Sequence, residues 1–147
     1  MRNTLLILHI ISVGTWIGAS ITVTFLSSGT KSRGDAAWKE FMGGFEKMSE
    51  RLYPAATIGV AITGVWLVID SNVYDFEHVF VIGGIAVVIS GIVLGTVVFT
   101  PLARRVTSGD VPEGSMEAVY RRFAAFGTLD IALLILAISL MVTKAGV

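Results

Sequence analysis

The sequence predicts an all-α polytopic membrane protein with four transmembrane helices in an up-down bundle. Hydrophobic residues make up 54% of the 147 residues and charged residues only 15%, whereas a soluble domain carries about 25% charged residues. Four apolar stretches, at about residues 5–26, 52–70, 79–100 and 123–143, have roughly the length that crosses a bilayer as a helix. None alternates polar and apolar residues as a membrane β-strand does. We therefore expect a single domain, residues 1–147, embedded in lipid.

The charge balance and the cysteine content exclude several classes of function. The chain has 11 basic and 11 acidic residues and no cysteine. A balanced charge provides no field that would recruit nucleic acid, so we expect no nucleic-acid partner. The lack of cysteine excludes disulfides, thiol catalysis and cysteine-ligated metal centres. No phosphate-binding loop, zinc-protease motif or nucleophile elbow is present.

Basic residues predict the orientation in the membrane. Nine of the eleven lie in the two long segments that join the first span to the second and the third to the fourth: Lys31, Arg33, Lys39, Lys47, Arg51, Arg104, Arg105, Arg121 and Arg122. Only Arg2 and Lys144 lie on the other side. Loops rich in lysine and arginine stay in the cytoplasm. We expect a multi-pass protein of the inner (plasma) membrane, with both termini outside.

The two basic segments are more than linkers. Residues 35–51 place apolar side chains at helical spacing, which predicts a cytoplasmic amphipathic helix that lies at the interface or extends the second span. Pro54 marks an entry or a kink. In the other segment we expect a break at Pro101, a second break over residues 107–114, and Ser115 as the N-cap of the last helix.

Small residues suggest where helices pack. Gly14 and Gly18 in the first span, and Gly91 and Gly95 in the third, have the spacing that lets membrane helices approach closely. We favour packing within one bundle. The alternative is a homodimer seam through Gly91 and Gly95, or contact with a larger membrane complex.

His9 is the strongest candidate for a functional residue. It lies inside the first span, and Ser12, Trp16 and Ser20 follow on the same helical face. Such a stripe should face the bundle, where a neutral imidazole can ligate iron. The alternative is a structural histidine that bonds to a serine or a backbone carbonyl on another helix, and the residue alone favours that alternative.

Three further ionisable residues are candidates for the functional site. His78 opens the third span on the same side of the membrane, where it is either a second ligand or an interfacial helix cap next to Asp75. Asp130 lies within the fourth span and must be protonated or paired there. Arg51 is its expected partner. We favour a structural pair, with a proton relay or a contact on the propionate side of a porphyrin as the alternative.

The segments LHIISVGTWIGA, ERLYPAATIGVAITGVWLV, TPLARR and YRRFAAFGTLDIALLILAISLMVTK follow one another along nearly the whole chain. In this order they resemble a family of uncharacterised four-helix bacterial membrane proteins related to the HemJ-type protoporphyrinogen oxidases and the copper-resistance D (CopD) domains. The resemblance implies a four-helix fold and haem binding by the first-span histidine, which His9 matches. Arg51, ahead of the apolar run with Pro54, also matches. No reaction is implied, because the third span has Phe80 where a HemJ-like span has a lysine.

These observations lead to three functional hypotheses. The first is binding of haem b or a porphyrin through His9, with Trp16 lining the pocket and His78 as a second ligand. The second is a non-enzymatic membrane subunit or scaffold that packs against a larger complex. The third, suggested by the CopD-like relationship, is transport or metal handling. Whether the protein is an enzyme is left open by the sequence.

Overall fold

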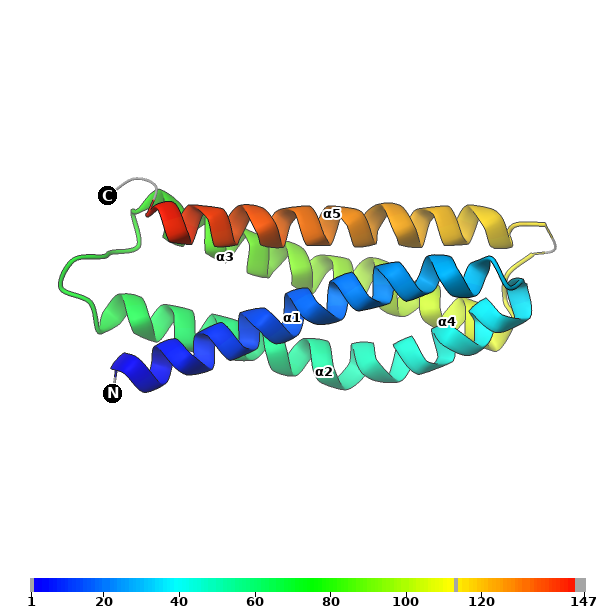
Figure 1. Cartoon of the computed structure of the whole chain (residues 1–147), viewed down its shortest axis with the longest axis horizontal. Coiled ribbons are helices and arrows are strands. Elements are labelled where there is room, and N and C mark those ends of the chain that lie inside the picture. Colours follow the sequence, from blue (N-terminus) through cyan, green and yellow to red (C-terminus); the bar gives the residue numbers. More distant parts are fainter. Residues whose placement is uncertain (1, 113, 145–147) are drawn as a thin grey trace.

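The computed structural model describes residues 2–112 and 114–144 and is helical throughout these ranges apart from the connections. Its elements are α1 (Arg2–Lys31), α2 (Asp35–Ile69), α3 (Val79–Val93), η1 (Leu94–Phe99), α4 (Thr100–Ser108) and α5 (Met116–Thr143). The segments α3, η1 and α4 follow one another without a break and form one long rod (Figure 1). Together with α1, α2 and α5 they make a bundle of four rods, which confirms the predicted fold class.

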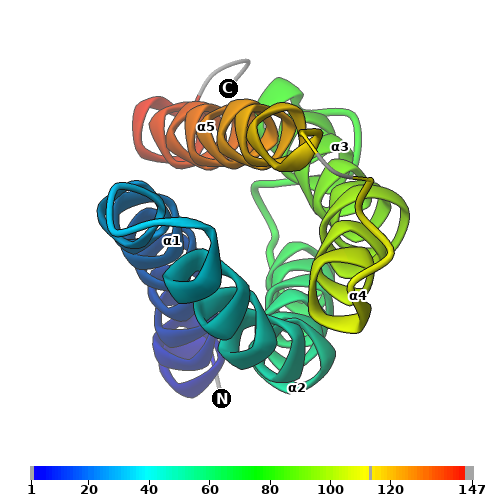
Figure 2. The same ribbon diagram turned by 90° about the vertical axis from the view of Figure 1, so that its right-hand side faces the viewer.

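The four rods run up and down, so that both termini lie at the same end of the bundle (Figure 1). The opposite end holds the connections that follow Lys31 and Ser108. We call it the basic end because nine of the eleven basic residues lie within residues 31–51 and 104–122, on either side of these connections. Each rod is long and apolar enough to cross a membrane. Viewed along the axis, the rods surround a shared interior (Figure 2). The chain is thus a multi-pass membrane protein.

The outer surface of the bundle is apolar. Isoleucine, leucine, valine and phenylalanine side chains are exposed along all four rods, among them Ile11, Phe25, Ile62, Ile89 and Ile135. A soluble protein seldom exposes a continuous apolar surface of this kind, because water penalises it. Lipid does not, so this surface agrees with burial in a bilayer.

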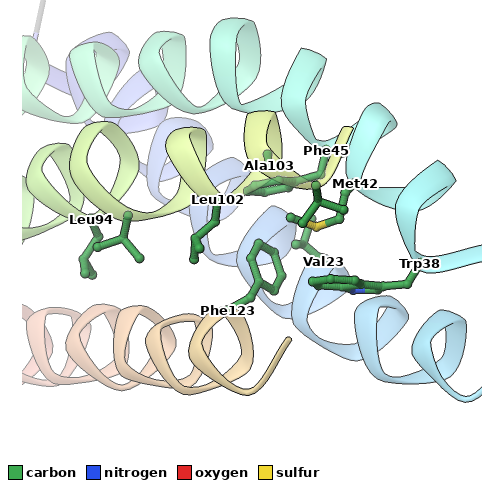
Figure 3. Close-up of a cluster of buried hydrophobic side chains, with 10 residues drawn as sticks. Val23, Trp38, Met42, Phe45, Leu94, Leu102, Ala103 and Phe123 are labelled. Atoms are coloured by element: carbon green, nitrogen blue, oxygen red, sulfur yellow. The ribbon is translucent and has the colours of Figure 1, made fainter. Parts of the chain in front are cut away.

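The predicted amphipathic segment 35–51 is the first part of α2, which continues through Pro54 as one helix to Ile69. The extension alternative is therefore confirmed, and the interfacial one is wrong. The physical reason is that its apolar face is covered from inside the protein: Trp38 and Met42 are fully buried. They belong to a cluster that we call the basic-end core (Figure 3), formed by Val23, Trp38, Met42, Phe45, Leu94, Val98, Leu102, Ala103, Val106 and Phe123.

The expected break at Pro101 is wrong. Pro101 lies at the start of α4, and the helix passes through it from the π-helical turn η1. Proline lacks an N–H group and its ring collides with the carbonyl group four residues earlier. The wider π turn just before it changes that local geometry, and π turns, although rare, occur mostly as single turns of this kind inside α-helices. The second expected break is present, with Gly109 in the left-handed conformation ending α4.

Ser115 is the N-cap residue of α5, as predicted, but its side chain makes no capping hydrogen bond. Ion pairs connect neighbouring rods at the basic end. Arg104 contacts Glu50 at 2.9 Å and Glu46 at 3.7 Å, which joins α4 to α2. Lys31 lies 3.6 Å from Glu117, which joins α1 to α5.

A second cluster, the mid-membrane core, occupies the centre of the bundle and consists of Trp16, Ala56, Val60, Val87, Leu134 and Ala137. The Trp16 ring lies directly on Gly91, where a Cβ atom would overlap ring carbons Cζ2 and Cη2. Gly91 is thus occupied by a contact within the chain, which supports intramolecular packing over a homodimer seam at this residue. Gly95, Gly14 and Gly18 have no such neighbour within 4 Å.

Candidate functional site

A cavity of about 410 Å³ lies in the half of the bundle that holds the termini. We call it the His9 cavity. Its volume falls within the usual range of ligand-binding pockets, roughly 300–1,000 Å³. Its lining comes from α1, α2, α3, the α2–α3 connection and one residue of α5: Arg2, Leu6, His9, Val60, Ala61, Gly64, Val65, Leu67, Val68, Tyr74, Phe76, Phe80, Val81, Gly84, Ile85, Val88, Ile89 and Met141. The walls are therefore apolar and aromatic, and His9 is the one ionisable side chain within the span.

The hydrogen bonds of His9 indicate which of its nitrogen atoms carries the proton. The imidazole is 9% exposed, and its Nδ1 lies 2.9 Å from Thr63 Oγ1. The Thr63 hydroxyl donates to the carbonyl oxygen of Gly59 in the preceding turn. A hydroxyl has a single proton, so Thr63 Oγ1 must accept from His9. We assign the neutral tautomer with the proton on Nδ1, which leaves a lone pair on Nε2.

His9 lines the cavity, and its ring contacts Thr63 through Nδ1 and the backbone of Val60. Within residues 2–112 and 114–144 no side-chain hydrogen bond involves Nε2. In the same residues no fully buried side-chain nitrogen or oxygen atom lacks a partner. Nε2 is thus not sealed by protein atoms, and the open space beside His9 is the cavity that it lines.

Gly64 leaves room for the imidazole of His9 against α2. A Cβ atom at this position would lie 3.2 Å from His9 Cε1, so the ring packs against the bare backbone of α2. Sequence reasoning anticipated a partner for His9 on another helix but missed Thr63 and Gly64. A signal was present, because Thr63 is the one hydroxyl residue between residues 58 and 69.

Trp16 does not line the His9 cavity, so that prediction is wrong. The indole is 3% exposed and belongs to the mid-membrane core, where it fills the space beside Gly91. The spacing from His9 placed both residues on one helical face, as the structure does. Seven residues along a helix is about 10 Å, however, which carries Trp16 out of the cavity.

His78 is not a second ligand facing the cavity. It is the N-cap residue of α3, and its Nδ1 lies 2.8 Å from Asp75 Oδ1. The backbone N–H of Glu77 donates to the same carboxylate. This bond is the main cause that holds the pKa of Asp75 below its ordinary value, and His78 adds to it. The alternative of an interfacial cap beside Asp75 is therefore the one that agrees with the structure.

Asp130 borders a second, smaller cavity of about 50 Å³ deeper toward the basic end, which we call the Asp130 cavity. The side chain is 5% exposed, and its Oδ2 accepts a hydrogen bond of 2.7 Å from Ser20 Oγ. Arg51 is exposed on α2 and forms no ion pair with any residue that the structure describes. The predicted Arg51–Asp130 pair is wrong, because Arg51 points away from the bundle while Ser20 of α1 faces Asp130.

A multi-ligand metal centre has no counterpart in the described part of the chain. No group of three or more histidine, aspartate or glutamate side chains is close enough there to hold an ion. The donor set instead consists of one imidazole nitrogen atom in an apolar cavity. A single imidazole ligand of this kind suits a metal that is already held by the nitrogen atoms of a macrocycle.

Comparisons with known proteins add no relative. A scan against protein-family models, a search of curated proteins and a search of solved structures each matched nothing. The resemblance to the HemJ-type and CopD families therefore stays a prediction.

Proposed function

We propose that this membrane protein binds haem b or a related porphyrin in the His9 cavity. The observation that carries the proposal is a buried imidazole that is fixed by Thr63 through Nδ1 and lines an apolar cavity of about 410 Å³; the assigned tautomer leaves its Nε2 lone pair free. Cofactor pockets are mostly apolar with a few oriented polar groups, and this cavity has that character.

The residues present fit the chemistry of such a ligand. His9 Nε2 offers the lone pair that haem iron accepts from a histidine. The Nδ1–H bond to Thr63 orients the ring and makes Nε2 more basic, as the outer hydrogen bond of a ligating histidine usually does. Arg2, at the edge of the cavity, supplies a positive charge for the carboxylates of a porphyrin. A bound haem would contribute a redox-active iron.

The proposal includes the orientation of the bundle in the membrane. The basic end faces the cytoplasm and both termini face outward across the plasma membrane, because nine basic residues lie toward one end and two toward the other. In this orientation the His9 cavity lies in the outer half of the bilayer, with Tyr74 and Phe76 of the α2–α3 connection closing its outer side. A ligand from the outer leaflet would then reach His9 without crossing the mid-membrane core.

A non-enzymatic membrane subunit is the second candidate. It is favoured by the open face of α1, where Gly14 and Gly18 have nothing within 4 Å and border a groove between α1 and α2. Close approach at small residues is how a transmembrane helix of another protein would pack there. Metal handling by a cluster of protein ligands has no support from the described residues.

The test is an absorption spectrum of the protein purified in mild detergent from haem-supplemented cells, in oxidised and dithionite-reduced forms. We expect a Soret band and reduced α and β bands that disappear in His9→Ala. His78→Ala is the matched control, since it removes the other histidine and should leave the spectrum unchanged. A colourless wild-type protein would overturn the proposal. So would a spectrum that His9→Ala leaves intact.

A further inference from the structure

We propose that Asp130 and the cavity beside it form an internal proton-binding site, in which Asp130 is a neutral carboxylic acid that exchanges its proton with water from the basic end only. Proton exchange here is a simple acid–base step. The carboxylate takes a proton from a hydronium ion in the cavity to form the acid and water, and in the reverse step the acid returns the proton to water as hydronium. This site is separate from the His9 cavity, and the two share no lining residue.

The surroundings of Asp130 disfavour a permanent negative charge. The residues of α1 that line its cavity (Trp16, Ser20, Val23 and Thr24) carry no charge, and neither do those of α3, η1 and α5 (Gly91, Gly95, Phe99, Phe123 and Gly127). From α2 the one titratable group is the phenol of Tyr53. No cation faces the carboxyl group from any of these elements. A charged carboxylate inside a membrane bundle is costly without a partner, whereas the acid form is not.

Water has room and partners beside Asp130. The cavity volume of about 50 Å³ corresponds to about three to five water molecules at the 10–15 Å³ that each requires by this measure. Ser20, Tyr53 and Thr57 bring hydroxyl groups to its wall. Asp130 lines this cavity, its Oδ2 accepts the bond from Ser20, and the Trp16 indole lies within reach of the same carboxyl group.

The polar wall of the cavity extends toward the basic end through Ser49. Ser49, one turn of α2 before Tyr53, lines the cavity and is only half-buried; its hydroxyl donates to the backbone carbonyl oxygen of Glu46 at 2.8 Å. The Glu46 side chain accepts a bond from Thr107 and pairs with Arg104 at the basic end. In the other direction the Trp16 ring, which belongs to the mid-membrane core, lines the cavity. The half-buried Ser49 hydroxyl is the point at which we place the entry of water and protons.

The first part of the test is infrared spectroscopy at neutral pH, where exposed carboxyl groups are ionised and give no carboxylic-acid carbonyl band. We expect such a band in the wild-type protein, its loss in Asp130→Asn, and its persistence in the control Asp70→Asn, which replaces an exposed carboxylate. If Asp130→Asn does not fold, Ser20→Ala decides instead, because loss of the Ser20 hydrogen bond must shift the same band. A wild-type protein without the band would overturn the proposal.

The second part determines the side from which the site is reached. The chain has no cysteine, so single cysteines report without background. Silver ions, small enough for a water-sized cavity, are added to one side of sealed vesicles, and Lys47→Cys with an impermeant reagent marks the basic end. We expect Thr57→Cys to react from that side only, and Ala137→Cys in the mid-membrane core to stay protected. Protection of Thr57→Cys from both sides, or its reaction from the termini side, would refute the access that we infer.

Discussion

Replacement of Gly91 by alanine tests whether the third rod really packs against Trp16. The new Cβ atom would overlap ring carbon atoms of the indole. Trp16 is 3% exposed and enclosed by the mid-membrane core, so its ring has little freedom to move aside. Gly18→Ala is the matched control, since it adds the same methyl group to a membrane helix at a position with nothing within 4 Å.

The expected size of the effect follows from two opposing contributions. Alanine is favoured over glycine inside a helix by up to about 1 kcal/mol, and both variants gain this. Overpacking a well-filled core costs about 1–3 kcal/mol, and only Gly91→Ala incurs it. We therefore expect Gly91→Ala to be less stable than Gly18→Ala by about 1–3 kcal/mol, and Gly18→Ala to be equal to the wild type or slightly more stable.

The assay is reversible unfolding in mixed micelles with rising denaturing detergent, followed by circular dichroism and by tryptophan fluorescence. Gly91→Ala should also change the emission of Trp16 in the folded state, because the ring must shift. Equal stabilities of the two variants would refute the packing argument. A Gly91→Ala protein of wild-type stability with weakened self-association would instead place Gly91 in a seam between two copies.

Three other predictions address the site and the basic end. Thr63→Val removes the acceptor of the His9 proton without changing volume, and titration with haemin should show a 10–100-fold loss of affinity; unchanged binding would contradict the assigned tautomer. Trp38→Phe loses the 3.1 Å bond to Ser27 Oγ and part of the ring, and should lower the unfolding free energy by about 1–3 kcal/mol in the same unfolding assay. Asp75→Asn should lower the thermal midpoint at neutral pH, because a depressed carboxyl pKa stabilises the protein only while Asp75 is ionised. The difference from the wild type should disappear once the pH falls below the lowered pKa of Asp75. A difference independent of pH would argue against a role for the ionised carboxylate.

The arrangement of the two cavities has a functional consequence. The His9 cavity is apolar and lies toward the termini, while the Asp130 cavity carries hydroxyl groups and lies toward the basic end. The mid-membrane core borders both, since Trp16 lines the Asp130 cavity and Val60 lines the His9 cavity. A ligand bound at His9 and a proton bound at Asp130 would thus occupy opposite halves of the membrane. The two proposals can fail independently, because a colourless protein leaves the carboxylic-acid band of Asp130 unaffected.

Local features of the chain could be predicted well, and their exceptions have local causes. The start of the last helix at Ser115 and the stop at Gly109 follow from residue types that favour those backbone conformations. The break predicted at Pro101 was wrong because a proline usually ends a helix, and the composition of residues 94–99 does not indicate the π turn that precedes it. The segment 35–51 has an apolar face in either arrangement, and only the presence of α4 and α5 decides what covers it.

The sequence by itself determined that this protein is a helical membrane protein, how many spans it has, and that both termini lie at one end. These properties depend on the length of apolar runs and on the count of basic residues, which need no knowledge of contacts. The tertiary structure alone decided that His9 meets Thr63, 54 residues away, that Asp130 meets Ser20, 110 residues away, and that Trp16 lies on Gly91 instead of beside a ligand. The reason is physical. In lipid both the outward and the inward faces of a helix are apolar, so hydrophobicity does not report how each helix is rotated, and the rotation of four helices together determines which polar side chains meet.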